Sequence, residues 1–391
     1  MAANDLTFEQ ISTILNSIAQ QATGQASLTA TNTSDFITIA QTTLKAGADP
    51  ILQAISQTLS KTIFSIRPYY EKFAGLRVDS QRWGNHVRKL NSVDRPFIDA
   101  EKWNVADGQS IDPFVIRTPE VLQTNFYGAD TYADQLTIFD DQLDNAFKGP
   151  DEFGSFISMI TQNITDKHAQ AREALARGCI ANLIGAKVAA DSGNVIHLLT
   201  EYNSATGITP ALDGQTVLQP ANYAPFMQWC YARIAEMSSK LTERSIKYHM
   251  NITGKEISRH TPMEKQKVFF YAPAKYAIEG RVLADTYHDN FIRFAWDETV
   301  NYWQAIDDPA AVNVKPSYID STGAVVTAGS ATKTDNIFCV LMDEEAAGYT
   351  TIHENMGSIR NPRALYSNIF WSIDLRYWND LTENCVIFLM D

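Results

Sequence analysis

Residues 148–190 read KGPDEFGSFISMITQNITDKHAQAREALARGCIANLIGAKVAA and carry the longest helical pattern in the chain. Pro150 and Asp151 are typical of the first turn of a helix. Apolar residues then recur three or four positions apart on one face, as far as about Ala190. At 1.5 Å per residue this helix would be roughly 60 Å long, which is longer than a compact domain needs. The sequence therefore predicts a spine along which other elements pack.

The chain after the spine alternates between predicted helices and strands. A helix is expected over 222–241, and a strand over 267–271 that runs into a helix over 273–287. Residues 317–334 are typical of a hairpin with a glycine-rich tip. Further strands are expected over 195–199, 302–306, 337–341 and 385–390. The last of these is apolar throughout, which predicts that it is buried within a sheet. The mixture of helices and strands indicates an α+β fold class.

The first seventy residues predict an arm instead of a domain. Short amphipathic helices are expected after Thr7, over 36–44 and from Asp49 onward, and a linker rich in small polar residues covers 22–34. These helices hold too little apolar surface for a core of their own. A neighbouring copy or, alternatively, the chain's own body must cover them. The apolar residues expected to contact a neighbour are Phe8, Ile11, Ile55 and Leu59.

Charge is unevenly distributed along the chain, whose formal net charge is −13. Residues 61–102 carry nine basic and five acidic side chains, whereas residues 104–166 carry eleven acidic and two basic ones. The acidic block contains short alternating runs at 114–117 and 135–139, which predict an extended, hairpin-like excursion. Adjacent blocks of opposite sign are either two solvated faces or complementary patches between copies. The residues expected to pair between copies are Arg82, Arg88, Lys89 and Arg95 with Asp140, Asp141 and Asp144.

Composition excludes several classes of protein. The chain has 391 residues, 45% of them hydrophobic, which indicates two or three folded units and excludes disorder. No stretch approaches the roughly 18 apolar residues that a membrane span needs, and no secretory signal is expected at the N-terminus. Cys179, Cys230, Cys339 and Cys385 show no CxxC spacing, so reduced thiols are expected. Aromatic residues make up 11% of the chain, which suits subunit interfaces as well as cores.

Motifs that would carry catalysis are missing from the sequence. There is no glycine-rich phosphate loop, HExxH or GxSxG pattern, and the histidines do not pair at metal-ligand spacing. Asp140, Asp141 and Asp144 lack the glycine and closing glutamate of a calcium loop, so they are expected to be solvated. We therefore expect no enzyme, no metal and no cofactor.

A second basic block covers residues 240–281, with nine bases and four acids. Such a block could contact nucleic acid, but no base-reading motif accompanies it. A subunit contact or plain surface is favoured for it.

Three stretches together resemble a known family. They are TLKAGADPILQAISQTLSKTIFSIRPYYEKF at 43–73, KVFFYAPAKYAIEGRVLADTY at 267–287 and RYWNDLTENCVIFLMD at 376–391. Combined with the arm, the acidic excursion and the spine, they resemble the major capsid protein of tailed bacteriophages, with the Hong Kong 97-type or Johnson fold. The resemblance spans the whole chain and rests on architecture, without a short diagnostic motif.

The resemblance implies a division of the chain and a function. The regions are an N-terminal arm at 1–70, an extended E-loop region at 71–148, a peripheral domain with the spine helix at 149–214, an axial domain at 215–345 and a return to the peripheral domain at 346–391. The implied function is self-assembly through pentamers and hexamers into an icosahedral head that encloses the genome. The implied partners are other copies, a portal, scaffold or cement proteins, and DNA held weakly and non-specifically, without a membrane. The implied location is the virion, after assembly in the host bacterial cytoplasm.

Two other classes compete with the capsid reading. One is another phage structural protein, such as a tail or portal-ring subunit, and the other is an α/β enzyme with a site within 195–310. One long helix in a mixed fold favours the shell, because tail tubes tend to be β-dominated and portals more helical. The missing nucleophile motif and the coreless arm argue against the enzyme.

Overall fold

A computed structural model describes residues 8–24, 30–45, 50–51, 54, 71–78, 87–95, 97, 105–190, 193–252, 255–282, 297–320 and 322–391. The helices are α1 (Phe8–Thr23), α2 (Thr33–Leu44), α4 (Asp140–Ala146), α5 (Pro150–Ala190), α6 (Leu198–Thr206), α7 (Pro220–Leu241) and α8 (Ala272–Val282), with short 3-10 helices at Ala74–Leu76, Thr216–Leu218 and Met263–Lys265. The strands are β1 (Val87–Ser92), β2 (Val121–Phe126), β3 (Ala129–Phe139), β4 (Val195–His197), β5 (Gln266–Tyr271), β6 (Asp297–Val300), β7 (Val312–Val314), β8 (Ser317–Ile319), β9 (Val325–Thr327), β10 (Thr332–Thr334), β11 (Ile337–Asp343), β12 (Ala347–Asn361), β13 (Tyr366–Asn379) and β14 (Cys385–Leu389).

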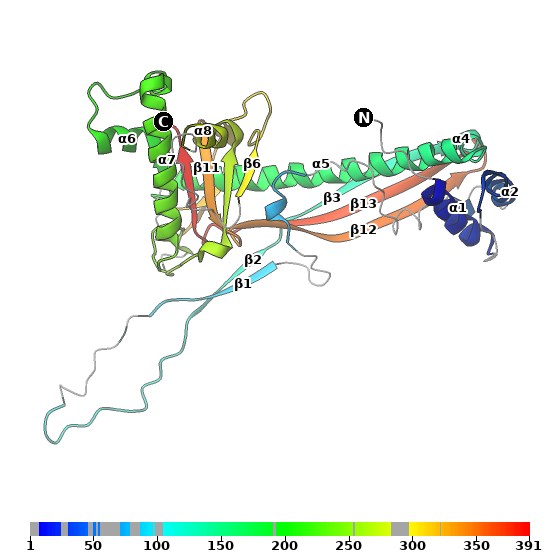
Figure 1. Ribbon diagram of the computed structural model, residues 1–391. Helices are drawn as coiled ribbons and strands as arrows, with labels where there is room; N and C mark the ends of the chain where they lie inside the picture. Colours follow the sequence, from blue (N-terminus) through cyan, green and yellow to red (C-terminus); the bar gives the residue numbers. More distant parts are fainter. Residues whose placement is uncertain are drawn as a thin grey trace.

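Helix α5 is the axis of the molecule, and its 41 residues confirm the predicted spine. Figure 1 shows a sheet with covering helices near its C-terminal end and long strands running beside the rest of its length. Asp151 and Glu152 lie in its first turn and Lys187 in its last, where each charge is favourable to the helix dipole. The sheet at one end of the spine and the long strands beside the rest of it form two different packing environments.

The first environment is a five-stranded sheet in the order β4-β14-β11-β5-β6. Every residue of β14 is buried, which confirms the expected burial of the terminal strand. Alternate residues point to opposite faces: Val340 and Ile387 pack toward α5, whereas Leu341 and Val386 pack toward α6, α7 and α8. Strand β4 pairs with β14, and β14 pairs with β11. This sheet therefore draws strands from three of the regions that the sequence resemblance separates.

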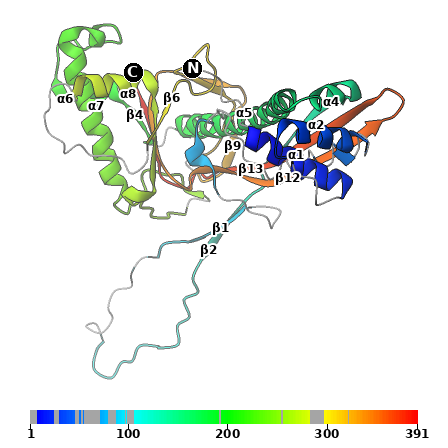
Figure 2. The same cartoon turned by 45° about the vertical axis from the view of Figure 1, so that its right-hand side comes forward.

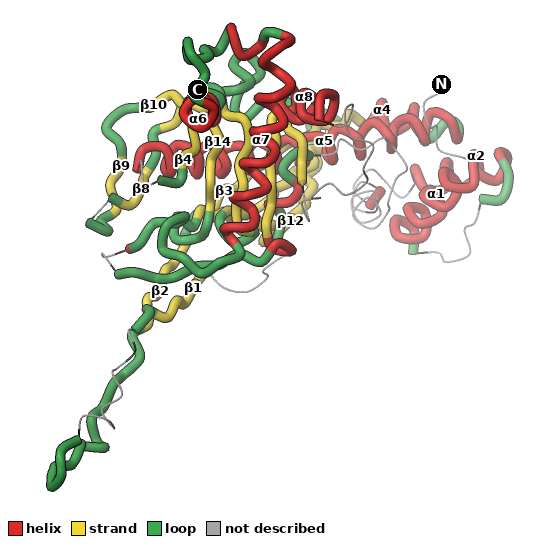
Figure 3. Tube along the Cα trace, turned by 60° about the vertical axis from the view of Figure 1, so that its left-hand side comes forward, coloured by secondary structure: helices red, strands yellow, loops and turns green. Residues whose placement is uncertain are grey.

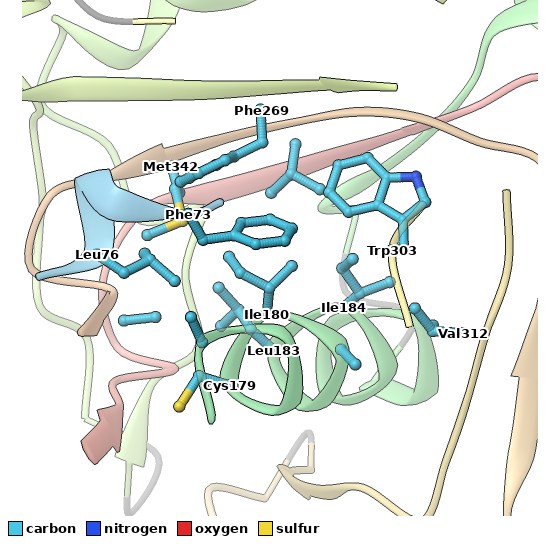
Figure 4. Packing of buried hydrophobic residues seen from close by; sticks show 14 of the residues in the cluster. Phe73, Leu76, Cys179, Ile180, Leu183, Ile184, Phe269, Trp303, Val312 and Met342 are labelled. Atoms are coloured by element: carbon cyan, nitrogen blue, oxygen red, sulfur yellow. The ribbon is translucent and has the colours of Figure 1, made fainter. Parts of the chain in front are cut away.

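A short strap, residues 71–78, enters the core between α5 and this sheet. Figure 4 shows the Phe73 ring among residues of α5, β5 and β11. Its ring centroid lies 5.2 Å from that of Phe269 and 6.3 Å from that of Trp303, and the Arg177 guanidinium lies over its face. Glu173 pairs with Arg177 and accepts a hydrogen bond from the Lys72 backbone N–H (3.2 Å). The strap is thus fixed by both apolar and charged contacts.

The second environment is a three-stranded antiparallel sheet in the order β12-β13-β3, which runs beside α5. The long β12–β13 hairpin is missing from the elements expected from the sequence. Along β13, buried residues alternate with more exposed ones over most of its 14 positions, whereas β12 is buried at its first four residues and largely exposed or half-buried over the rest of its 15. A bulge lies in β12 between Thr351 and His353. At one end the two strands approach each other closely, because a Cβ on Gly348 of β12 would lie 2.4 Å from the Trp378 ring of β13.

Helices α1 and α2 pack at the far end of the spine, against α4, α5 and β13 (Figure 2). Their apolar faces are covered by the chain's own body, which is the second of the two locations expected for the arm. Helix α2 begins at Thr33, and the Asn32 side chain caps it by accepting the Asp35 backbone N–H (2.9 Å). The helix therefore begins before the predicted position 36, with Ser34 and Asp35 in its first turn.

Three expected strands end or pair differently from the prediction. The strand expected over 195–199 stops at His197, where α6 begins. Within 317–334, β8 pairs with β9 as a hairpin, but β10 pairs with β7 instead. Residues 114–117 are not a strand. The Asp112 side chain accepts the Phe114 backbone N–H (2.9 Å) in a turn, and residues 115–117 pair with no strand of the described chain.

The strand expected over 302–306 is wrong as well. Trp303 is buried, and its indole N–H donates to the Ile337 carbonyl oxygen (3.1 Å). The Gln304 side chain exchanges two hydrogen bonds with the backbone of Asn313 (2.6 and 3.1 Å). Side-chain hydrogen bonds thus replace the strand ladder that the apolar alternation suggested.

Several sequence expectations fall outside the described residues. They are the Thr7 cap, most of the helix expected from Asp49, the end of the helix expected over 273–287, and the proposed contact residues Ile55, Leu59 and Arg82.

Candidate functional site

The most conspicuous feature of the surface is a thin projection. Strands β1 and β2 pair antiparallel from Val87↔Phe126 to Ser92↔Val121, and the described chain between them extends away from the body in Figures 1, 2 and 3. We call β1, β2 and the described residues between them (93–95, 97 and 105–120) the ribbon. Residues 105–126 of the ribbon match the first part of the hairpin-like excursion that the sequence predicts. The second predicted run, 135–139, lies instead in β3 and pairs with β13 in the three-stranded sheet.

The far part of the ribbon exposes large apolar side chains. Phe114 is 84% exposed and Ile116 is 86% exposed, and Val115 lies between them. Exposed contiguous apolar side chains are rare on soluble monomers and typically mark an interaction surface. Phe97, Val105, Ile111 and Val121 add to the exposed apolar area. The ribbon is therefore built to be covered by something other than the described part of its own chain.

The root of the ribbon is held by charge. Lys89 on β1 lies 2.9 Å from Asp380 and 3.0 Å from Glu345, and its amino group also donates to Glu383. Burial lowers the pKa of Lys89, but the charges of Asp380 and Glu383 outweigh it and raise the pKa above its ordinary value. Arg259 pairs with Glu383 from the other side (3.1 Å).

The basic block at 240–281 contributes to the same root. Arg244 pairs with Asp94, which follows β1, and Lys255 pairs with Glu120, which precedes β2. Arg259 pairs with Glu383, as described above. These cations meet acids of their own chain, so the structure gives the block a role that the sequence did not suggest.

A broad uncharged face lies on the three-stranded sheet. Directly paired residues of neighbouring strands share a face, so the register defines which side chains lie together. They are Thr131, Ala133, Gln135, Thr137 and Phe139 of β3, Tyr366, Asn368, Phe370, Ser372 and Asp374 of β13, and His353, Asn355, Gly357, Ile359 and Asn361 of β12. Asp374 is the only Asp, Glu, Lys or Arg among them, and Phe139, Ile359 and Phe370 remain exposed. We call this the sheet face.

The residues expected to pair between copies lie at two separate places. Arg88 and Arg95 are exposed on the ribbon, whereas Asp141 and Asp144 are exposed on α4 at the far end of α5 (Figure 1). None of the four has an ion-pair partner within the described chain. The structure does not bring the two groups together in one subunit, so a pairing between them requires a second copy.

The other proposed contact residues have partners in their own subunit. Asp140 pairs with Arg360 (2.7 Å), and Lys89 is held at the ribbon root. Phe8 is half-buried, and Ile11 is buried against the spine. A contact between Ile11 and a neighbour would first require the arm to leave its site.

Sequence reasoning missed the acids that hold the ribbon. Glu345, Asp380 and Glu383 flank apolar strands that were recognised, but their partner lies almost 300 positions away: Lys89 and Glu383 are separated by 294 positions. The only available signal was the acidic run at 343–345, next to a predicted strand.

The described residues give little support for metal binding, a membrane span or reactive thiols. They contain no group of His, Cys, Asp and Glu side chains that could hold a metal ion. Among the described helices, none combines the length and apolar character that crossing a membrane requires. All four cysteines are buried, and burial raises the pKa of the Cys179 thiol to about 12.

The spine helix, the two sheets and the projecting ribbon together define the class: this is the Hong Kong 97-type capsid fold. The chain belongs to the family of Phi29-like phage major capsid proteins, and the match covers residues 11–389. It is a structural protein of the phage capsid and not an enzyme. The family match also decides against the tail and portal alternatives.

Solved structures with this fold are distant in sequence. The capsid structure of Staphylococcus phage Andhra is 11% identical with a TM-score of 0.57, and the match covers 84% of this chain and 87% of that one. A structure described as the head fiber and inner core protein gp22 of native bacteriophage P68 is 10% identical with a TM-score of 0.55, over the same shares. Curated proteins gave no match.

Proposed function

We propose that this chain assembles with copies of itself into pentamers and hexamers, and that these form the icosahedral head that encloses the genome of a tailed bacteriophage. The observation that carries the proposal is the ribbon, whose apolar side chains around Phe114 and Ile116 are left exposed by the described chain. A repeated contact of this kind suits a shell, because each subunit offers a projection and receives one.

The sheet face is the surface that fits the ribbon best. It is nearly free of charge in a chain with a net charge of −13, and it carries exposed Phe139, Ile359 and Phe370. Gly357 lies directly opposite Phe370, and no atom lies within 4 Å of a Cβ added there, so the surface is open beside the ring. An uncharged, partly apolar face loses little solvation when an apolar segment covers it.

Opposite charges supply a second contact between copies. Arg88 and Arg95 on the ribbon and Asp141 and Asp144 on α4 are exposed and far apart within one subunit. Pairing between neighbours would orient them and speed their encounter more than it would add affinity.

The sequence resemblance supports the finer parts of the proposal. The proposed regions are an N-terminal arm at 1–70, an extended E-loop region at 71–148, a peripheral domain at 149–214 with 346–391, and an axial domain at 215–345. A portal and scaffold or cement proteins are the other expected partners, DNA is contacted weakly, and assembly takes place in the host bacterial cytoplasm. The acidic total supports weak contact, because a negative chain does not grip a polyanion.

The experiment is to express the full chain and examine it by sedimentation and negative-stain electron microscopy. The unaltered protein should form capsomers or closed shells. A variant with Phe114→Ser, Val115→Ser and Ile116→Ser should give soluble subunits of unchanged circular dichroism, because the replaced side chains are exposed. Val325→Ser is the matched control, since Val325 is an exposed apolar residue on β9, outside the ribbon. Normal shells from the triple variant would refute the role of the ribbon.

The contact with the sheet face is tested separately. A photo-crosslinking residue at position 115 should capture β13 of another copy when isotopically labelled and unlabelled subunits are mixed. Phe370→Asp should abolish the crosslink. Crosslinks confined to a single labelled chain, or mapped elsewhere, would contradict this landing site.

A further inference from the structure

The ribbon cannot set its own direction. A two-stranded hairpin is marginally stable in water, and six residue pairs join β1 to β2. Most side chains of the two strands are exposed or half-buried, so little apolar area binds them to the body. Contacts at the root must therefore decide where the ribbon points.

An inner contact is formed by Lys89. Its amino group is surrounded by Asp380, Glu383 and Glu345, and Arg259 reaches the same Glu383. The side chains of Asp380 and Glu383 are nearly buried, so loss of Lys89 would leave two carboxylates close together away from water. Such a contact is poorly screened by salt.

Two outer contacts lie at the strand ends that face the far part of the ribbon. Asp94 pairs with Arg244 and also accepts the Ser258 backbone N–H (2.6 Å). Glu120 pairs with Lys255. These side chains are between one third and two thirds exposed, and exposed ion pairs are individually weak and screened by salt.

Both outer contacts are made by residues of the same loop. Arg244, Lys255 and Ser258 all belong to the loop between α7 and β5, and Arg259 of the same loop joins the inner contact. The loop itself is closed by a pair of backbone hydrogen bonds between Ser245 and Arg259 (2.8 and 2.9 Å). One loop thus grips both strands of the ribbon.

We propose that Lys89 and the described loop residues 244–252 and 255–259 form a two-stage electrostatic latch that presets the ribbon direction in the free subunit, and that ionic strength releases the outer stage first. The inference rests on the proposed function only in that the ribbon is the part that reaches a neighbour. It assigns Lys89, Arg244 and Lys255 as positioning residues, which act on assembly through the ribbon and touch no neighbour themselves.

Hydrogen exchange on the full-length, unassembled protein tests the latch. Peptides from 87–95 and 119–127 should exchange faster when sodium chloride rises from about 0.05 M to about 0.5 M, because salt screens the outer contacts. In the double variant Arg244→Ala with Lys255→Ala, these peptides should exchange at least about tenfold faster at low salt and lose most of their salt response. Lys89→Met should accelerate exchange at both salt concentrations.

Lys167→Met is the matched control. It removes an ion pair of similar exposure, Lys167 with Asp134 (2.7 Å), from the spine and β3. Ribbon exchange should be unchanged in this control, and α5 and β14 peptides should be unchanged in every variant. If Lys89→Met does not fold, the double variant still tests the latch. Its replaced side chains are exposed, so it should fold.

Two results would overturn the latch: ribbon exchange that is unaffected in the double variant, or equally affected in the control. Shell formation is scored separately by electron microscopy. A protein that exchanges as expected but never assembles would retain the latch and refute the proposed function. A protein that forms shells with a salt-insensitive ribbon would refute the latch alone.

Discussion

Ile11 of α1 lies over Gly154 of α5, and its Cδ1 atom is 2.7 Å from the point that a Cβ on residue 154 would occupy. Ile11 is 4% exposed, so this contact belongs to the packed interior at the far end of the spine. Glycine inside a helix costs about 0.5–1 kcal/mol relative to alanine. The close approach of the arm explains why glycine is present at that turn.

The contact predicts an unequal response of two helix glycines to alanine. Gly178→Ala should stabilise the protein by about 0.5–1 kcal/mol, because the space around a Cβ there is open. Gly154→Ala should gain less or lose stability, because Ile11 must move. In an Ile11→Ala background, which itself should cost about 2–4 kcal/mol, Gly154→Ala should stabilise as Gly178→Ala does. Denaturant unfolding measures the cycle, and equal gains at both glycines with Ile11 present would contradict it.

Charge reversal tests the pairing between copies. Arg88→Glu with Arg95→Glu should leave the fold intact and abolish shells, because both side chains are exposed and lack internal partners among the described residues. Adding Asp141→Lys and Asp144→Lys should restore assembly by exchanging the signs. Electron microscopy and sedimentation provide the measurement. Shells from the first variant, or no rescue by the second, would count against these pairs.

Acid should lower the stability of the protein through His249, which lies in the loop that contacts the ribbon. His249 is buried, and burial lowers its pKa below the ordinary value of 6.5, although its ring N–H donates to the Ile257 carbonyl oxygen (2.5 Å). Below pH 6.5 the His249 imidazole is therefore protonated more readily in the unfolded chain than in the folded chain. The free energy of unfolding should therefore fall as the pH drops below 6.5, by up to about 1.4 kcal/mol per pH unit.

The measurement is denaturant unfolding between pH 7 and pH 5. His249→Gln should flatten the pH dependence, whereas His260→Gln, at an exposed position of the same loop, should leave it unchanged. An identical slope in the unaltered protein and His249→Gln would remove His249 as its source.

The four cysteines should be unreactive in the folded protein. Burial raises the pKa of Cys179 to about 12 and that of Cys385 to about 11, and the thiolate is the reactive form. Iodoacetamide at neutral pH should label none of them in the native state and all four in denaturant, as measured by mass spectrometry. Rapid native labelling of Cys179 would contradict its packing against the core.

Much of the fold could be predicted because its signals are local. The spine, α7, β5, β11 and β14 have helical or strand periodicity that can be read within a short window. The β12–β13 hairpin was missed because only one of its faces is buried, and its polar face breaks the apolar run. The 302–306 strand was wrong because Trp303 and Gln304 make side-chain bonds to distant backbone groups.

The candidate site was predicted only in outline. A projecting excursion and opposite charge blocks were expected, but Lys89 and the 240–281 block turned out to hold the ribbon of their own chain. The exposed residues Arg88, Arg95, Asp141 and Asp144 stay predictions for contacts between copies.

The sequence by itself determined the long helix, the buried terminal strand and the uneven charge, because periodicity and composition are properties of neighbouring residues. Only the tertiary structure decided which charges meet and which apolar residues stay uncovered. Lys89 and Glu383 are brought together across 294 positions because β1 lies against the turn between β13 and β14. Ile11 is covered and Phe114 is left exposed for the same reason: burial depends on what the fold places opposite a side chain.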